Sequence, residues 1–149
     1  MRRSRHAPLV CGALLLVSAA ACSQRNRAAT SSTSPRGGAT VVQGSDLMSR
    51  SGNLLDALRG RVSNMRVDRM QGRCPLITLR GQKTIIGSTD PTIYIDGTRM
   101  GDTCSLDQLQ VVSVERVEVY AGGISPPAGY APAANGTILV FLTGGMVRR

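Results

Sequence analysis

The stretch VERVEVYAGG, residues 114–123, alternates apolar and polar side chains and then ends in two glycines. Alternation with a period of two predicts a β-strand, because successive side chains of a strand point to opposite faces of the sheet. We expect one face of this strand to carry Val117 and Val119. The other face carries Arg116, Glu118 and Tyr120, and we expect the two charged residues to line an exposed face of the sheet.

The two glycines, Gly122 and Gly123, can adopt backbone angles that are closed to other residues, so they predict a sharp exit from the strand. The segment 125–134 is rich in Pro, Ala and Gly, which is typical of a loop. We expect it to return the chain to a neighbouring edge position of the sheet. The next segment is continuously apolar from Ile138 to Leu142, as expected of a strand that is covered on both sides.

The N-terminus has the composition of a secretory signal peptide, which we assign to residues 1–21. Three arginines within the first five residues precede an apolar stretch from Leu9 to Ala21. This stretch is shorter than the roughly 18 residues that a membrane-spanning helix needs.

Three alanines lead directly into Cys22, and this ending resembles the lipobox of bacterial lipoproteins. The resemblance implies cleavage before Cys22 and attachment of acyl chains, such as palmitate, to its thiol and new amino group. Several chains make a stable anchor at about 0.8 kcal/mol per buried methylene. The alternative is an ordinary cleaved signal peptide. Ser23 follows where lipoproteins kept at the inner membrane carry Asp, so the resemblance implies lipid anchoring at the bacterial outer membrane, facing the periplasm or the cell surface.

Two cysteines, Cys74 and Cys104, remain after the signal peptide and the lipidated residue are set aside. In an oxidising compartment such a pair most simply forms a disulfide. Zinc binding and redox chemistry are the alternatives. Both lack support, because the chain has no CxxC motif and its only histidine, His6, lies in the signal peptide.

The mature chain is long enough for one domain. Residues 22–44 are rich in Ser, Thr, Gly and Ala and predict a flexible tether, so we assign the folded domain to residues 45–146. Within the tether, the segment ATVVQG weakly resembles a TonB-interacting box.

The order of the expected elements defines the fold class. Apolar spacing predicts a helix through Leu54, Leu58 and Val62, with Ser51 or Asn53 as its N-cap. Short strands are expected at 65–67 and 76–80, and Asp96-Gly97 predicts a hairpin between a strand at 92–95 and a return strand through Arg99 and Met100. A second helix is expected through Leu106, Leu109 and Val112, capped by Ser105. The sequence therefore predicts an α+β domain with a small mixed sheet of about four strands and two or three short helices.

In this order the segments resemble the plug domain of TonB-dependent receptors. The likeness rests on NLLDALRGRVSNMRV, PLITLRG, PTIYIDGTRM and LQVVSVERVEVYAGG followed by ANGTILVFLT, and it covers essentially the whole mature domain. The residues in the motif positions are Arg80, Gly81, Asp96, Gly97, Glu115, Glu118, Gly122, Gly123, Asn135 and Gly136. Ala121 departs from the pattern, because the family usually has a basic residue there.

The resemblance implies a non-enzymatic function. The chain ends soon after Thr143, so we expect a stand-alone plug domain without the roughly 22 strands of a receptor barrel. The first hypothesis is an interaction module at the outer membrane, with a receptor barrel or a TonB-type protein as its partner, besides the lipid that Cys22 would enter. The second is a lipoprotein that captures a small ligand on its loops.

The composition argues against an enzyme and against a nucleic-acid-binding protein. The mature chain has no histidine for Ser-His or Cys-His catalysis, and Glu115 and Glu118, three apart in a strand, are expected to point to opposite faces. No catalytic residues, cofactor or metal site are therefore expected. The formal net charge is +9. The arginines are scattered among few aromatic residues, so we expect no nucleic-acid partner.

Overall fold

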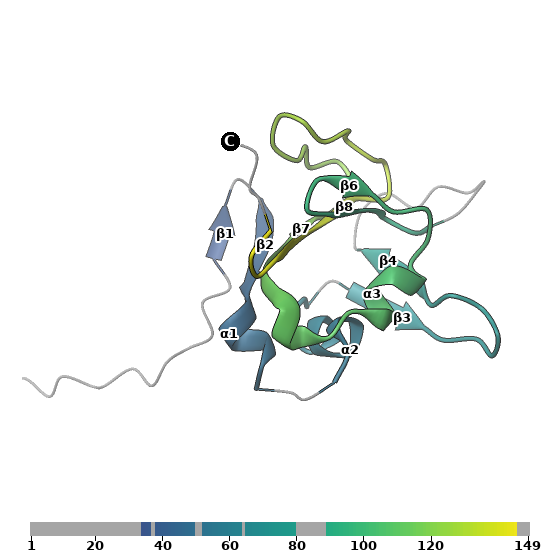
Figure 1. The fold of residues 1–149 in the computed structure, drawn as a ribbon. Helices are drawn as coiled ribbons and strands as arrows, with labels where there is room; N and C mark the ends of the chain where they lie inside the picture. Colours follow the sequence, from purple (N-terminus) through teal and green to yellow (C-terminus); the bar gives the residue numbers. More distant parts are fainter. Residues whose placement is uncertain (1–33, 37, 50–51, 64, 80–88, 146–149) are drawn as a thin grey trace, which may run out of the picture.

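The computed structural model describes residues 34–36, 38–49, 52–63, 65–79 and 89–145 of the 149-residue chain. These residues form a six-stranded sheet with the strand order β1-β2-β7-β8-β5-β6 and a separate two-stranded sheet, β3-β4 (Figure 1). The elements follow the chain as β1 (Ser34–Arg36), β2 (Ala39–Gln43), α1 (Gly44–Leu47), α2 (Leu54–Arg59), β3 (Met65–Asp68), β4 (Leu76–Leu79), β5 (Thr92–Ile95), β6 (Thr98–Arg99), α3 (Cys104–Gln108), the 3-10 helix η1 (Val111–Ser113), β7 (Val114–Tyr120) and β8 (Thr137–Leu142). The α+β class and the mixed sheet are confirmed.

The centre of the large sheet contains the two strands expected around the Pro, Ala and Gly loop, but β8 lies between β7 and β5 and not at an edge as expected. Strands β7 and β8 run antiparallel, and β8 also pairs with β5 in parallel. The continuous apolar run of β8 is buried from Ile138 to Val140, which fits a strand covered on both faces. The sheet has six strands and not the four or so that we expected. The additional strands are chiefly β1 and β2, which form an antiparallel hairpin beside β7 at one edge of the sheet.

Strand β2 changes the expected boundary of the domain. We expected a tether as far as residue 44, but Thr40–Gln43 pair with β7, and Ala39, Val41 and Val42 are buried. Helix α1 continues directly from this strand and buries Leu47. The ordered domain therefore begins before residue 45, and the segment that weakly resembles a TonB-interacting box is a paired strand of the sheet. Cys22 and the signal peptide lie outside the described residues.

The main core lies on the face of the large sheet that is covered by α2, α3 and the β3-β4 pair. Leu54, Leu55 and Leu58 of α2 are fully buried there, together with Ile77 of β4 and Leu106 of α3. Helix α2 begins as predicted at Asn53, whose side-chain oxygen accepts a hydrogen bond from the Asp56 backbone N–H at 2.9 Å. This cap satisfies one of the free donors in the first turn.

Helix α3 is shorter than the apolar spacing predicted. It spans Cys104–Gln108 and is preceded by Thr103, so Ser105 is inside the helix and not its N-cap. Its end at Leu109 leaves Val112 in η1 with 69% of its surface exposed. The chain leaves the helix early because the Leu109 carbonyl accepts a hydrogen bond from the Leu54 backbone N–H, which joins this segment to the start of α2.

The predicted hairpin is confirmed. Strand β5 pairs with β6, and both turn residues have positive φ, 46° at Asp96 and 81° at Gly97. These angles fit the primed turn that matches the twist of a two-residue hairpin.

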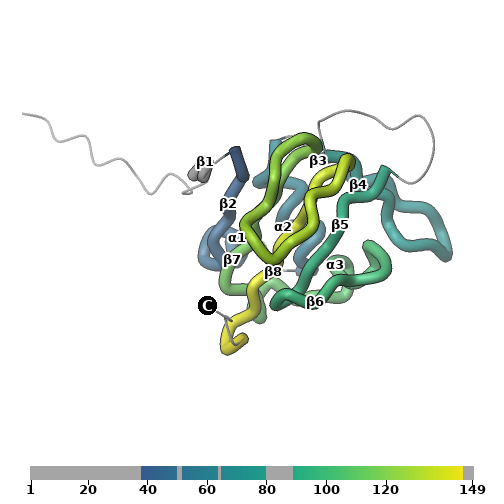
Figure 2. The backbone as a smooth tube through the Cα atoms, turned by 90° about the horizontal axis from the view of Figure 1, so that it is seen from above, coloured from purple at the N-terminus to yellow at the C-terminus, as the bar shows by residue number. Residues whose placement is uncertain are grey.

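The second face of the large sheet is covered by a loop instead of a helix. The loop from Ala121 to Gly136 lies over strands β7 and β8 when the molecule is seen from above (Figure 2). Tyr130 and Ile124 of this loop pack against a small cluster of buried side chains, namely Ala39, Tyr94, Tyr120 and Leu139. No helix in the described part of the chain is long and apolar enough to cross a bilayer.

Candidate functional site

A cluster of charged and aromatic side chains lies on the second face of the sheet, and Arg116 is at its centre. The Arg116 Nε donates to Glu118 at 3.0 Å, and Nη1 donates to Glu115 at 3.2 Å. The guanidinium carbon lies 3.7 Å from the centre of the Phe141 ring, a cation–π contact. We call the surface formed by Arg116, Glu118 and Phe141 the Arg116 face.

A β-bulge explains how one arginine contacts both glutamates. The pairing of β7 with β8 shifts register between Val114 and Arg116, which leaves Glu115 as the extra residue. The expectation that Glu115 and Glu118 point apart is therefore wrong, because it assumed an unbroken period of two. The same shift lets Val114 and Val117, three residues apart, both join the main core.

The Glu118 carboxylate accepts a second hydrogen bond besides the one from Arg116. The Tyr120 hydroxyl donates to its other oxygen at 2.8 Å. Burial, followed by this bond to an anion, raises the pKa of the Tyr120 hydroxyl well above its ordinary value. Tyr120 therefore stays protonated and keeps its donor role over the physiological pH range.

The loop over this face is fixed by aromatic contacts. The rings of Tyr94 and Tyr130 meet edge to face with their centres 5.0 Å apart, and the Ala131 N–H donates to the Tyr94 hydroxyl at 3.4 Å. Burial is also the main reason that the pKa of Tyr130 is raised. These contacts join the loop to β5, which is distant in sequence.

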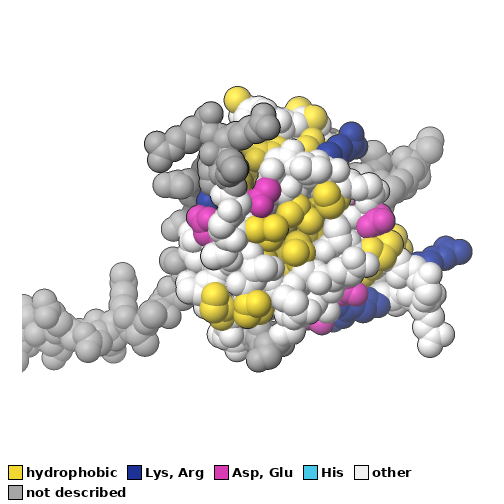
Figure 3. Space-filling view, in the orientation of Figure 1, with side chains coloured by type: hydrophobic (Ala, Val, Ile, Leu, Met, Phe, Trp, Pro, Cys, Tyr) yellow, Lys and Arg dark blue, Asp and Glu magenta, His cyan; other side chains and the backbone are white. Residues whose placement is uncertain are grey.

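The Arg116 face is less exposed than the sequence suggested. The side chain of Arg116 is 24% exposed and that of Glu118 is 13% exposed, because Arg116 lies against the Phe141 ring and Glu118 is bound by the Tyr120 hydroxyl. Hydrophobic side chains gather over β7 and β8 in the space-filling view, with acidic side chains beside them (Figure 3). The face therefore combines a small apolar area with an ordered ion pair, which is a composition suited to protein contact.

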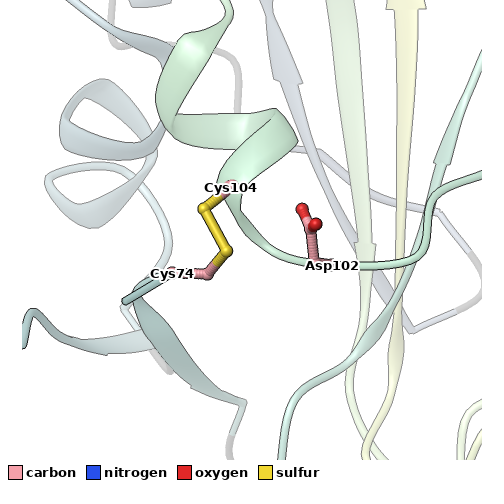
Figure 4. Close-up of side chains that lie close together, drawn as sticks. All are labelled: Cys74, Asp102 and Cys104. Atoms are coloured by element: carbon pink, nitrogen blue, oxygen red, sulfur yellow. A yellow bond between two sulfur atoms is a disulfide. The ribbon is translucent and has the colours of Figure 1, made fainter. Parts of the chain in front are cut away.

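The disulfide predicted between Cys74 and Cys104 is formed (Figure 4). It joins the loop before β4 to the first residue of α3, and beside it the Thr103 hydroxyl donates to the Pro75 carbonyl at 2.5 Å. Among the described residues, the one group of three potential metal ligands is these two cysteines with Asp102. Since the two sulfurs are bonded to each other, they are not thiolates and cannot act as metal ligands in this state.

The remaining plug-motif residues have structural roles where they are described. The Asp96 carboxylate accepts a hydrogen bond from the Leu142 backbone N–H at 2.9 Å. Asn135 and Gly136 precede β8, and Gly136 has a φ of 92°. Gly123 also has positive φ, at 87°, which confirms the predicted exit from β7. Arg80 and Gly81 lie outside the described residues.

An ion-pair cluster that the sequence did not reveal connects the two helices with the small sheet. Arg69, just after β3, donates to the carboxylates of Asp56 on α2 and Asp107 on α3, at 2.7 and 2.5 Å. The bond from Arg69 is the main reason that the pKa of Asp56 is lowered. Asn53 also donates to Asp107 at 3.1 Å. No local pattern could have shown these three contacts, because each joins residues that are 13, 38 or 54 positions apart.

A pocket of about 390 Å³ lies beside the disulfide. It is bounded by Cys74, Leu76 and the hairpin residues Arg99 and Met100, and Asp102 lies at its rim. Its volume is within the range of small-molecule sites, which begins at roughly 300 Å³.

Comparison with known proteins identifies a family whose domain matches most of this fold. The family model of the TonB-dependent receptor plug domain matches residues 32–137. This is a receptor domain and not an enzyme family. No curated protein matches the chain.

Several solved receptor structures share the fold. The RagAB peptide importer in its closed-closed state has a TM-score of 0.58 and 21% identity, over 74% of this chain and 13% of that chain. The ferric enterobactin receptor of Pseudomonas aeruginosa has a TM-score of 0.53 and 17% identity, over 72% and 18%. The ferric yersiniabactin uptake receptor FyuA of Yersinia pestis has a TM-score of 0.51 and 22% identity, over 70% and 17%.

The chain thus spans less than a fifth of each of these receptors, and the matched part is a single domain of them. The family model covers most of the described sheet, from β1 to the start of β8. This chain therefore belongs to the TonB-dependent receptor plug domain family.

Proposed function

We propose that this protein is an outer-membrane lipoprotein whose plug domain is an interaction module for envelope receptor or transport machinery. The observation that carries the proposal is the Arg116 face, an ordered ion-pair and aromatic surface on the side of the sheet that no described helix covers. A receptor barrel or a TonB-type protein is the partner that the family suggests. The plug-family match supports this reading, because the similar structures are receptors and importers.

The composition of the face supports protein contact more than catalysis. Arg116 is bound to both glutamates and to the Phe141 ring, so its charge is already balanced within the chain. An arginine held in this way can still donate to a partner carboxylate, and its partly exposed aromatic neighbour offers apolar area. Tyr120 retains its proton and is not a candidate general base.

Lipid anchoring through Cys22 is the second part of the proposal. It is supported by the sequence around Cys22, and mass spectrometry of the N-terminal peptide from isolated membranes tests it. We expect acyl chains on Cys22 and no signal peptide. A Cys22→Ser variant should carry no acyl chains at this position. An unmodified Cys22 in the membrane-extracted protein would contradict the anchor.

The interaction is tested by crosslinking in intact cells, followed by mass spectrometry without reducing agent. We expect an outer-membrane receptor or a TonB-type protein to be crosslinked, and Arg116→Ala to reduce its yield. Arg66→Ala is the matched control, because Arg66 is an exposed strand arginine with a side-chain exposure of 81%. Equal yields for both variants would argue against the Arg116 face as the contact surface.

The pocket beside the disulfide favours a second candidate function, the capture of a small ligand. Its charged rim residues and its volume of about 390 Å³ are the supporting observations. Calorimetric titration with ferric chelates or Ca²⁺ tests this function. Micromolar binding that Arg99→Ala or Asp102→Ala abolishes would favour it over the interaction module.

A further inference from the structure

The domain exposes apolar side chains at the end of the large sheet where the chain enters it. Met48, at the C-cap of α1, has 54% of its surface exposed, and Val112 of η1 has 69%. Helix α1 packs against η1, so the two residues belong to neighbouring elements. We call this surface, Met48 with Val112, the Val112 end.

The register of the strands places the entry of the chain at the same end. Strand β1 pairs antiparallel with β2, and Ser34 lies opposite Val41. Strand β1 therefore begins toward the end of β2 that leads into α1, which lies below the sheet in Figure 1. Strand β7 also begins at this end, directly after η1, because Gln43 lies opposite Arg116.

The length of the preceding chain limits how far this end can be from Cys22. Eleven residues, 23–33, lie between Cys22 and Ser34. A fully extended chain of this length spans at most about 40 Å, and any other conformation is shorter. If Cys22 carries the anchor, the start of β1 stays within about 40 Å of the bilayer, at the end of the sheet that also carries Met48 and Val112.

The charges at this end are compatible with lipid head groups. The Arg61 Nη2 donates to the Ser49 hydroxyl at 2.5 Å, which places a guanidinium beside the residue that follows Met48. Arg59 is also exposed at the end of α2. Of the acidic side chains nearby, Asp46 is half-buried, Asp56 is paired with Arg69 and Glu115 is bound to Arg116. Apolar side chains flanked by arginines are typical of surfaces that lie in the membrane interface.

We propose that the Val112 end docks onto the bilayer that carries the anchor, with Met48 and Val112 entering the boundary between head groups and acyl chains. This proposal rests on the lipid anchor of the proposed function. Docking would fix the orientation of the domain and point the opposite end of the sheet, with the loop from Ala121 to Gly136, away from the membrane. The Arg116 face would then be roughly perpendicular to the membrane surface and accessible to a partner protein beside the domain.

The chain contains no tryptophan, so a single substitution gives an unambiguous fluorescent reporter. The full-length protein is isolated from membranes as Val112→Trp, Met48→Trp or Met70→Trp and reconstituted with vesicles of phosphatidylethanolamine and phosphatidylglycerol that carry brominated acyl chains. Met70 is the matched control, because 49% of its surface is exposed and the loop between β3 and β4 lies on the side away from α1 in both backbone views (Figures 1 and 2).

We expect blue-shifted emission and bromine quenching for Val112→Trp and Met48→Trp that are at least about twofold stronger than for Met70→Trp, as insertion of about 5–10 Å requires. Equal, weak quenching in all three variants would overturn the proposal. A blue shift without bromine quenching would also overturn it, since a protein and not lipid would then cover this end.

The mass of the Cys22 peptide from the same samples separates this proposal from the anchor. Acylated Cys22 with an unquenched Val112→Trp would refute docking and leave the anchor intact. Unmodified Cys22 with no quenching would refute both. Unmodified Cys22 with strong quenching on addition of vesicles would support docking through the Val112 end alone.

Discussion

The Asp96 carboxylate accepts a hydrogen bond from the Leu142 backbone N–H at 2.9 Å and so fixes the β5-β6 turn to the end of strand β8. The Asp96 backbone N–H also donates to the Val140 carbonyl at 2.9 Å. The Asp-Gly motif therefore has two roles, because it forms the turn and closes the parallel pair of β5 and β8. Only the first role could be inferred from the dipeptide itself.

Asp96→Ala should lower the free energy of unfolding by about 1–2 kcal/mol, because it removes a charge-assisted hydrogen bond and places alanine at positive φ. Asp96→Asn should retain most of the stability, since asparagine tolerates this backbone conformation and keeps an acceptor oxygen. Urea unfolding measures both. Asp102→Ala, at an exposed loop position, is the control and should change stability by less than about 0.5 kcal/mol. Equal losses for Asp96→Ala and Asp102→Ala would show that the contact with Leu142 contributes nothing.

The Cys74–Cys104 disulfide closes a loop with a sequence separation of 30 residues. On the chain-entropy model it contributes about 3–4 kcal/mol, a large share of the stability of a small domain. The double variant Cys74→Ser/Cys104→Ser should therefore unfold at a much lower urea concentration than the oxidised protein. Addition of dithiothreitol should bring the wild-type protein to a similar midpoint and leave the variant unchanged. A wild-type midpoint that does not respond to the reductant would mean that the bond is absent in solution.

Arg69→Ala should cost about 1 kcal/mol at pH 6, because the pairs with Asp56 and Asp107 are partly exposed and screened. Arg66→Ala removes a single, more exposed pair at 4.0 Å and should cost less than about 0.5 kcal/mol. Chemical denaturation of the two variants under identical conditions gives the comparison.

The contribution of Arg69 should also depend on pH. The pKa of Asp56 is lowered in the folded protein, so its contribution is present above the unfolded value of about 3.9 and is lost as the pH falls through the folded pKa. The difference in stability between wild type and Arg69→Ala should therefore be largest near pH 6 and shrink below about pH 4. A difference that stays constant from pH 6 to pH 2 would rule out the ion pair as its source.

Gly136→Ala should be more harmful than Gly129→Ala, although both glycines have positive φ, 92° and 101°. A Cβ at residue 136 would lie 2.4 Å from the Tyr120 carbonyl oxygen, whereas nothing lies within 4 Å of one at residue 129. The change at 129 should cost about 1–2 kcal/mol for backbone strain alone, and the change at 136 should cost clearly more. Thermal unfolding of the two variants distinguishes them, and equal midpoints would contradict the close approach of β7 to the start of β8.

Local chemistry explains which parts of the fold could be predicted from the sequence. The Asn53 cap, the Asp96-Gly97 turn and the apolar run of β8 depend on neighbours in the chain, and all three were found. Strand β2 was missed because its partner β7 is distant in sequence and because Val41 and Val42 are buried side by side, which hides the period of two.

The site was predictable in its residues but not in its geometry. Arg116, Glu118 and Tyr120 share a face as the alternation indicated, while the bulge that brings Glu115 to Arg116 has no mark in the sequence. Burial of Tyr120 depends on a loop that returns over the sheet, and this tertiary contact cannot be derived from the strand alone.

The measurement that tests the central claim most directly is site-specific photo-crosslinking in intact cells. A photoreactive phenylalanine analogue is placed at Phe141, on the Arg116 face, or at Met70, on the β3-β4 loop. We predict that the probe at residue 141 captures a receptor barrel or a TonB-type protein, and that the probe at residue 70 does not. If the two positions give the same products, or neither gives an envelope protein, the plug domain does not act as an interaction module through the Arg116 face.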